Sequence, residues 1–148
     1  IRDAQESRGL GDVYKRQAHN FGGIKAIVNS VSNIYDDLII VYGCGGERDS
    51  SEREKIMKFA CTNSRKVIFT SDNCRNESFQ SILDDSRKDQ EYSNLIVESD
   101  RKRAIKSGLE VIKEDEILLI LGKGHEEFQE INGTKIPFND QRVVEKML

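Results

Sequence analysis

The chain has 148 residues, of which 33% are charged and 36% are apolar, and its net charge at neutral pH is −3. This size and composition predict one globular domain with a heavily charged surface. The slight negative charge gives no reason to expect a nucleic acid or an anionic membrane as a partner, and no apolar stretch approaches the roughly 20 residues of a membrane span. The three cysteines lack metal-binding spacing and are expected to be reduced thiols, as in a cytosolic protein.

Residues 1–17 differ from the rest of the chain. They show neither the apolar periodicity of a helix nor a strand-like apolar run. Residues 8–17 resemble translated sequencing-adapter read-through, of the kind found at the ends of environmental assemblies; an ordinary flexible tail is the alternative. We therefore predict that residues 1–17 are a non-native or disordered head, and that the domain comprises residues 18–148.

From residue 18 onward, helical and strand-like patterns alternate. Three-four spacing of apolar residues predicts amphipathic helices, and short continuous apolar runs predict buried strands. On the first helix the inward positions are Ile24, Ile27, Val28, Val31 and Ile34. The expected elements are helix 23–35, strand 38–42, helix 52–60, strand 66–70, helix 77–86, strand 95–97, helix 101–112, strand 117–121, extended runs 128–131 and 134–138, and a last helix to residue 148.

Capping and turn residues support these elements. The expected N-caps are Ser50 or Ser51 for the second helix, Asp100 for the fourth, and Asn139 or Asp140 for the last. Asn-Gly at residues 132–133, between two extended runs, is a strong signal for a β-hairpin. The sequence therefore predicts an α/β fold: a Rossmann-like, mainly parallel sheet flanked by helices, with a C-terminal β-hairpin at one edge and a short last helix.

Three polar, irregular loops follow the strands that end at residues 42, 70 and 121. They comprise residues 43–49, 71–75 and 122–126. In a right-handed parallel α/β sheet such loops emerge on one side, and ligands bind there in open α/β folds. The side chains expected to gather in one crevice are Arg48, Asn73, Arg75, Lys123, His125 and Glu126.

These residue types suit an amino acid as the ligand. A guanidinium pairs with a planar carboxylate through two hydrogen bonds, while Glu126 and Asp72 suit an ammonium group. Two separated arginines, Arg48 and Arg75, suggest more than one carboxylate. Each of these residues also has a structural interpretation, as a turn cap, an exposed ion pair or part of a tight turn.

Several familiar site patterns are absent from the sequence. His19 and His125 are the only histidines, and neither has a second metal ligand at helical spacing. We recognise no Ser-His-Asp or Cys-His arrangement, no P-loop and no Gly-x-Gly-x-x-Gly after the first strand. We therefore assign no metal site and no catalytic residue to this chain.

Five short segments resemble the C-terminal domain of the Mur ligases. They are Ala18-His19-Asn20, residues 43–49, residues 71–75, residues 122–126 with Phe128-Gln129, and residues 137–140. The resemblance covers residues 18–148 and is closest to the members that add 2,6-diaminopimelate to the peptidoglycan precursor. The last four of these segments each lie at the end of a predicted strand, and they occur in the same order as in the family, which makes the match specific.

The resemblance implies a part of an ATP-dependent amide ligase. In this family ATP phosphorylates the terminal carboxylate of UDP-MurNAc-L-Ala-D-Glu, and the amine of the incoming amino acid attacks the acyl phosphate. The C-terminal domain presents meso-diaminopimelate, whereas ATP and Mg²⁺ are bound mainly by a central domain that is absent here. The family is bacterial and cytoplasmic, with no nucleic-acid or membrane partner, and the chain alone is expected to be inactive.

The resemblance also assigns residues. The implied diaminopimelate-binding residues are Arg48, Asp72, Asn73, Cys74, Arg75, Gly122 and Glu126, and the candidate nucleotide or domain-closure contacts are His19, Asn20, Lys123 and His125. Arg75 with Asn73 would hold the distal carboxylate, and Glu126 would meet the ammonium at the same end. Cys74 stands where the family pattern has proline, which removes a fixed φ from this loop.

Two alternatives stay open. One is a ligase of the same family that selects lysine or another amino acid, although lysine lacks the distal carboxylate and would leave Arg75 unpaired. The other is a non-catalytic α/β module that binds an anion or a nucleotide.

Overall fold

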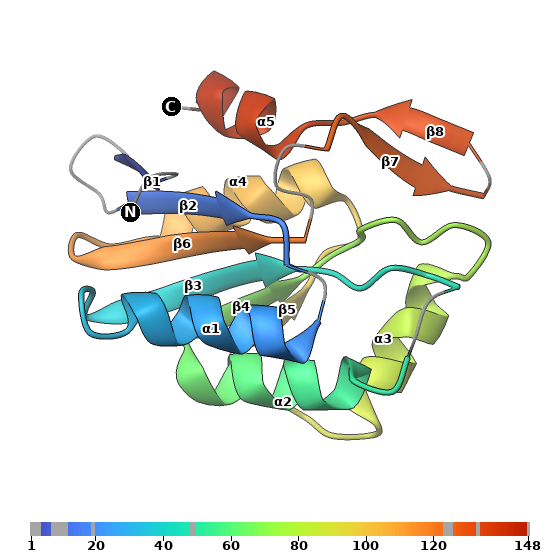
Figure 1. Ribbon diagram of the computed structural model, residues 1–148, viewed down its shortest axis with the longest axis horizontal. Helices are drawn as coiled ribbons and strands as arrows, with labels where there is room; N and C mark the ends of the chain where they lie inside the picture. Colours follow the sequence, from blue (N-terminus) through green and yellow to red (C-terminus); the bar gives the residue numbers. More distant parts are fainter. Residues whose placement is uncertain are drawn as a thin grey trace.

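The computed structural model describes residues 4–6, 12–18, 20–47, 50–122, 126–132 and 134–147. Within these residues a six-stranded sheet has the strand order β1-β2-β6-β3-β4-β5, and every pairing except β1–β2 is parallel (Figure 1). The strands are β1 (Ala4–Glu6), β2 (Asp12–Arg16), β3 (Asp37–Tyr42), β4 (Lys66–Phe69), β5 (Leu95–Val97) and β6 (Glu116–Leu121). The helices are α1 (Phe21–Val31), α2 (Arg53–Asn63), α3 (Phe79–Arg87), α4 (Arg101–Val111) and α5 (Asp140–Met147). The predicted Rossmann-like α/β fold is confirmed.

Helices cover both faces of the sheet. Successive side chains of the central strands point to opposite faces, and each face packs against its own set of helices in a separate core. Leu38, Ile40 and Tyr42 of β3 pack with α1, α2 and α3, which lie below the sheet in Figure 1. Ile39 and Val41 pack with α4 and α5, which lie above it. A strand buried on both faces needs apolar side chains at every position, which explains the continuous apolar run in the sequence.

The parallel strands end level with one another. Tyr42 of β3 is opposite Phe69 of β4, and Arg16 of β2 is opposite Leu121 of β6. The arrowheads of β2, β6 and β3 therefore point to one end of the molecule in Figure 1. The loops that follow these strands start side by side, as the sequence predicts.

Residues 12–16 differ from the expectation of a disordered head, because they form β2 inside the sheet. The strand pairs in parallel with β6, and Val13 is fully buried against the α4–α5 core. An unpaired β6 edge would expose a row of backbone N–H and C=O groups, and β2 satisfies them. Sequence patterning missed the strand because Lys15, the next inward residue, is charged and yet buried. The foreign origin of residues 1–17 stays a prediction.

The first helix is shorter than its apolar spacing predicts. It begins after Asn20, whose side-chain oxygen accepts a hydrogen bond from the backbone N–H of Gly23 at 2.7 Å. It ends at Val31, so Ile34 lies beyond it. Ile34 is 63% exposed, and its expected burial is wrong. The cap, and not the periodicity, determines where the helix starts.

The other predicted caps have mixed outcomes. Asp100 caps α4 and Asn139 caps α5, through hydrogen bonds from the backbone N–H groups of Arg103 and Arg142 at 3.1 and 3.0 Å. On α2 the N-cap position is Glu52, without a side-chain cap, so neither predicted serine fills the role. The third helix starts at Phe79 after the cap Ser78, and not at Glu77.

The C-terminal hairpin consists of β7 (Phe128–Ile131) and β8 (Thr134–Pro137), paired antiparallel around the predicted turn. It forms a separate two-stranded sheet and does not extend an edge of the main sheet. The side-chain nitrogen of Gln129 instead donates to Ser71 Oγ and to the carbonyl oxygen of Asp72, at 2.5 and 3.0 Å. These bonds hold the hairpin over the loop that follows β4.

The buried ion pair between Arg101 and Asp140 connects the core beneath α4 and α5 to the carboxyl ends of the strands. Arg101 Nε and Nη2 donate to the two carboxylate oxygens of Asp140, each at 2.8 Å, and both side chains are fully buried. The same guanidinium donates to the carbonyl oxygens of Ser71 and Leu121 at 3.1 and 3.2 Å. It therefore joins α4, the start of α5 and the carboxyl ends of β4 and β6.

We expect Asp140→Asn to lower the free energy of unfolding by about 3–5 kcal/mol, because it leaves the buried Arg101 charge without its counterion. Urea unfolding followed by circular dichroism measures this difference. The matched control is Glu127→Gln, which breaks an ion pair to Arg142 whose side chains are 52% and 71% exposed. The control should change stability by less than about 1 kcal/mol; equal effects of the two variants would contradict the prediction.

Candidate functional site

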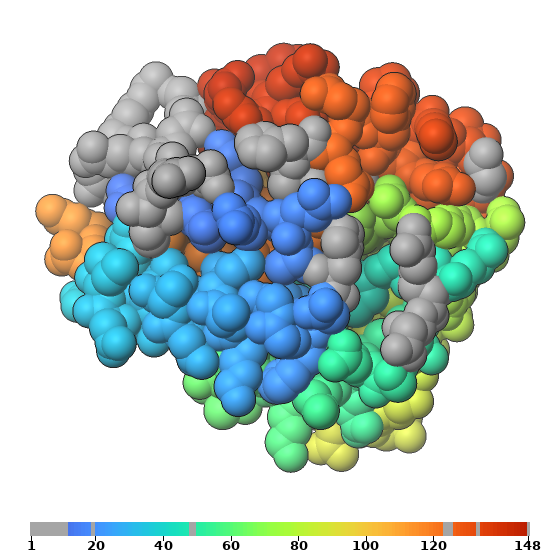
Figure 2. Space-filling model, in the orientation of Figure 1, coloured from blue at the N-terminus to red at the C-terminus, as the bar shows by residue number. Residues whose placement is uncertain are grey.

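A cavity of about 510 Å³ lies at the carboxyl ends of the parallel strands. Its size is in the range of small-molecule binding sites. In Figure 2 the blue segment near residue 20 and the teal and light-green loops after β3 and β4 meet beneath the orange C-terminal part. The lining residues are Gln17, Asn20, Cys44, Gly45, Glu52, Arg53, Ile56, Asp72, Asn73, Arg75 and Glu126.

The structure brings several of the sequence-predicted site residues to this cavity. Asp72, Asn73 and Arg75 come from the loop after β4, Glu126 from the segment after β6, and Asn20 from the cap of α1. The remaining predicted contacts in the other loops are His19, Arg48, Lys123 and His125, which lie outside the described residues. The predicted residues therefore bring one cation, Arg75, and two carboxylates, Asp72 and Glu126, to the cavity at the expected end of the sheet.

Cys74 does not line this cavity, although the motif position predicted it as a contact. Its side chain is 4% exposed and packs in the core under α1, α2 and α3. Burial raises the pKa of the Cys74 thiol above its ordinary value. The residue therefore supports the loop from below, where an apolar side chain is favoured over a polar one.

Gly122 also acts within the protein and is not among the lining residues. Its φ is +116°, and a Cβ atom there would lie 2.4 Å from Asp72 Oδ2. Its backbone N–H donates to the carbonyl oxygen of Arg16 at 3.0 Å. Glycine is thus needed so that the Asp72 carboxylate, which is 1% exposed, can approach the β6 end closely. A contact of Gly122 with a ligand stays a prediction.

The Arg75 guanidinium is held by two backbone carbonyl oxygens and by the carboxylate of Glu130. Its Nη1 donates to the carbonyl oxygens of Gly46 and Asn73 at 3.0 and 3.1 Å, and its Nε lies 3.8 Å from Glu130 Oε2. Its backbone N–H donates to the carbonyl oxygen of Glu130, and its own carbonyl accepts from Asn132. Nη2 makes no hydrogen bond with any described residue. The guanidinium therefore keeps donor capacity at the wall of the cavity.

Asn73 and Glu126 connect the loops after β4 and β6. The side-chain nitrogen of Asn73 donates to Glu126 Oε1 at 3.3 Å, and its oxygen accepts from the backbone N–H of Glu130 at 2.9 Å. The other Glu126 oxygen accepts from Gln17 Nε2 at 3.0 Å. Sequence reasoning missed Gln17 because residues 1–17 were set aside. The strand that places Gln17 has no apolar run in the sequence, so no local signal indicated this residue.

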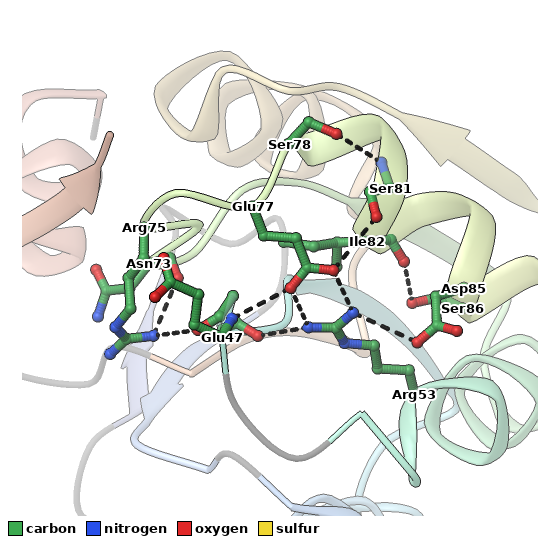
Figure 3. A network of polar contacts seen from close by, with 12 residues as sticks. Glu47, Arg53, Asn73, Arg75, Glu77, Ser78, Ser81, Ile82, Asp85 and Ser86 are labelled. Carbon is green, nitrogen blue, oxygen red and sulfur yellow. Dashed lines mark hydrogen bonds and ion pairs between the residues drawn. The ribbon is translucent and has the colours of Figure 1, made fainter. Parts of the chain in front are cut away.

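Arg53 is a second arginine of the cavity that sequence reasoning missed. It is 4% exposed, and its Nη1 and Nη2 donate to the two carboxylate oxygens of Glu77 at 2.8 and 2.9 Å (Figure 3). Asp85 lies 3.3 Å from Nη1, and the carbonyl oxygen of Gly45 accepts from Nη2 at 2.9 Å. An arginine in the first turn of a charged helix gives no local sign of burial, because its partners are 24 and 32 residues away.

No three His, Cys, Asp or Glu side chains in the described part of the chain are placed to hold a metal ion. The same part of the chain contains no helix that is long and apolar enough to cross a membrane.

Comparison with known proteins identifies the family. The family model described as "Mur ligase, glutamate ligase domain" matches residues 5–124. The chain belongs to the Mur ligase family. A solved structure of a UDP-N-acetylmuramoyl-L-alanyl-D-glutamate–2,6-diaminopimelate ligase superposes on this Mur ligase domain with a TM-score of 0.89 and 30% identity, over 97% of this chain and 30% of that one. The resemblance found in the sequence is confirmed.

Curated relatives with the same enzyme name are more similar in sequence. The ligase of Helicobacter hepaticus is 43% identical over 130 residues, which are 86% of this chain and 27% of that protein. The ligase of Aquifex aeolicus is 44% identical over 116 residues, or 75% of this chain and 23% of that protein. This Mur ligase domain thus spans about a quarter of the length of these relatives.

We expect the Arg53–Glu77 pair to make the stability of the domain depend on pH in acid. The hydrogen bonds from Arg53 lower the pKa of Glu77 to about 2, from its ordinary value of 4.5. A carboxyl with a lowered pKa stabilises the folded state above about pH 4.5, and this contribution disappears as the pH falls through about 2. Because Glu77 is 25% exposed, we expect a contribution of about 1–2 kcal/mol after solvent screening.

The measurement is urea unfolding of the wild type and of Glu77→Gln between pH 7 and pH 2. The difference in free energy of unfolding should be largest at pH 7 and approach zero near pH 2. Glu110→Gln, on the exposed face of α4, is the matched control and should show no such trend. A Glu77→Gln difference that does not change with pH would contradict the prediction.

Proposed function

We propose that this Mur ligase domain binds meso-diaminopimelate for an ATP-dependent ligase that adds it to UDP-N-acetylmuramoyl-L-alanyl-D-glutamate. The observation that carries the proposal is the convergence of Asn73, Arg75 and Glu126 on one cavity at the carboxyl ends of the strands. The relatives that are 43% and 44% identical bear the name of this ligase, which supports the same assignment.

The charges of the cavity suit one end of an amino acid. The Arg75 guanidinium offers donors to a carboxylate, and Glu126 offers an acceptor to an ammonium group. Asn73 lies between them, with its side-chain nitrogen 3.3 Å from Glu126 Oε1. A ligand with both groups on one carbon can therefore pair with Arg75 and Glu126 at the same time.

Arg75 also favours diaminopimelate over lysine in this proposal. The two amino acids share a chain and an amine, but lysine has no distal carboxylate. The Arg75 side chain is only 18% exposed, so a lysine ligand would desolvate its guanidinium further without pairing it. An unpaired charge of this kind is costly, and the selectivity arises from that cost.

In the complete ligase, ATP with Mg²⁺ supplies the phosphoryl group that activates the terminal carboxylate of UDP-N-acetylmuramoyl-L-alanyl-D-glutamate. The residues of this chain bind and orient the incoming amino acid, so that its free amine lies near that carboxylate. Such positioning lowers the entropic part of the barrier. We place this reaction in the cytoplasm, with the nucleotide-linked precursor and ATP bound by the other domains.

We expect the 148-residue chain alone to release no phosphate from ATP in the presence of diaminopimelate and the dipeptide precursor. The family resemblance assigns ATP and Mg²⁺ mainly to a central domain, and the chain spans only about a quarter of the length of its curated relatives. A coupled phosphate-release assay measures the rate, and the full-length Helicobacter hepaticus ligase is the positive control. Turnover by the chain above the uncatalysed rate would contradict the proposal.

The recognition residues can be tested in a chimera in which residues 18–148 replace the matching segment of the Helicobacter hepaticus ligase. Arg75→Ala should raise the KM for diaminopimelate roughly 10- to 100-fold, the effect of losing hydrogen bonds to a charged group. The KM for ATP should change by less than about twofold, and the preference for diaminopimelate over lysine should fall.

Arg103→Ala is the matched control, because Arg103 lies on the exposed face of α4. Arg75→Lys keeps the charge but not the fork of donors, so it should recover only part of the loss. Equal changes in the KM values for diaminopimelate and ATP would count against a role in amino-acid recognition. A folded chimera without turnover would count against the proposed function itself.

A further inference from the structure

A buried arginine outside the predicted site connects the two loops that form the walls of the cavity. Arg53 Nη2 donates to the carbonyl oxygen of Gly45, in the loop after β3, at 2.9 Å. Nη1 and Nη2 also donate to the carboxylate of Glu77, at the end of the loop after β4, at 2.8 and 2.9 Å. One guanidinium therefore holds both loops from the first turn of α2.

Glu77 extends this connection to the backbone of the first loop. Its Oε1 accepts a hydrogen bond from the backbone N–H of Glu47 at 3.1 Å. Glu47 returns the contact, since its own carboxylate accepts from the backbone N–H of Asn76 at 2.6 Å. Figure 3 shows the Glu47 and Glu77 side chains between the two loops, with Arg53 on one side and Arg75 on the other.

The two loops are packed without space between them. The backbone N–H of Gly46 donates to the carbonyl oxygen of Asn73 at 2.7 Å, and Arg75 Nη1 donates to the carbonyl oxygen of Gly46 at 3.0 Å. A Cβ atom on Gly46 would lie 1.8 Å from the carbonyl oxygen of Cys74. A shift of the first loop must therefore move Arg75 as well.

Two residues of this segment have a backbone conformation that is unfavourable for residues with a side chain. Glu47 and Arg75 both have a φ of 54°, in the left-handed region that disfavours residues with a side chain. Such conformations persist where the surrounding contacts hold them. Here those contacts are the carboxylate of Glu77 on Glu47 and the carbonyl oxygens around Arg75.

We propose that the Arg53–Glu77 pair is a positioning device that sets where the Arg75 guanidinium lies and thereby selects an amino acid with a second carboxylate. The inference rests on the proposed function of the domain. Glu77 is not among the residues that line the amino-acid cavity, so it acts through the loop backbone and Arg75. The hydrogen bonds from Arg53 lower the pKa of Glu77 to about 2, so this carboxylate is ionised at neutral pH.

The test is Glu77→Gln in the ligase chimera. The KM for diaminopimelate should rise by about tenfold or more, since a displacement of about 1 Å at a binding group costs up to a hundredfold. The preference for diaminopimelate over lysine should fall by the same factor, while kcat and the KM for ATP change by less than about twofold. A role in stability alone would lower the melting temperature and the active fraction, and would leave the KM unchanged.

Asp85→Asn is the matched control. Asp85 also lies against Arg53, at 3.3 Å, but it belongs to α3, and its other ion pair is to Lys88. Its loss should leave the KM for diaminopimelate within about twofold of the parent value. Arg53→Met should reproduce the Glu77→Gln effect, and Arg53→Lys should recover part of it, because lysine keeps the charge without the fork.

The outcomes separate this inference from the proposed function. If Arg75→Ala raises the KM for diaminopimelate and Glu77→Gln does not, the positioning role is overturned and the proposed function stands. If neither variant changes that KM, the proposed function fails. If Asp85→Asn is as damaging as Glu77→Gln, Arg53 acts on the fold and not on the loop, which also overturns the inference.

Discussion

The buried Arg101–Asp140 pair is the contact on which the architecture of the cavity depends. Its guanidinium binds the last helix and the carbonyl oxygens of Ser71 and Leu121, at the points where two cavity loops begin. A buried ion pair adds little net stability over an apolar replacement, but removal of one partner is severe. The pair therefore acts mainly by fixing geometry: the ends of β4 and β6 cannot separate while it is intact.

The guanidinium of Arg53 likewise fixes the position of the loop after β3. Arg53 fixes that loop to Glu77, and Gln129 and Asn73 attach the hairpin to the loop after β4. Most polar groups at this end of the sheet are thus used internally. Arg75 lines the cavity with part of its donor set not engaged by the described residues, which suits a ligand, whereas the Arg53 Nε that also lacks a hydrogen-bond partner is buried. The rigid surroundings keep that donor capacity in one place.

The proposed function divides the reaction, with recognition of the amino acid in this domain and activation by ATP in the rest of the ligase. The described residues of the domain contain no cluster of three side chains that could hold a metal ion. Its cavity contains Arg75 and Glu126, which carry opposite charges and are connected by hydrogen bonds through Asn73. This division is consistent with a chain that spans about a quarter of the length of its curated relatives. In the proposed function, selectivity between amino acids depends on a few side chains at strand ends, and the sheet beneath them need not change.

The sequence alone was sufficient for the parallel α/β fold and for the loops that carry Asn73, Arg75 and Glu126. Apolar runs, caps and strand-end loops are local patterns, and the level ends of parallel strands follow from them. The tertiary structure decided the burial of Arg53 and Cys74, the inclusion of residues 12–16 in the sheet, and the contact of Gln17 with Glu126. The partners in those contacts are far apart in the chain, so no local pattern indicates which charged side chain will be buried.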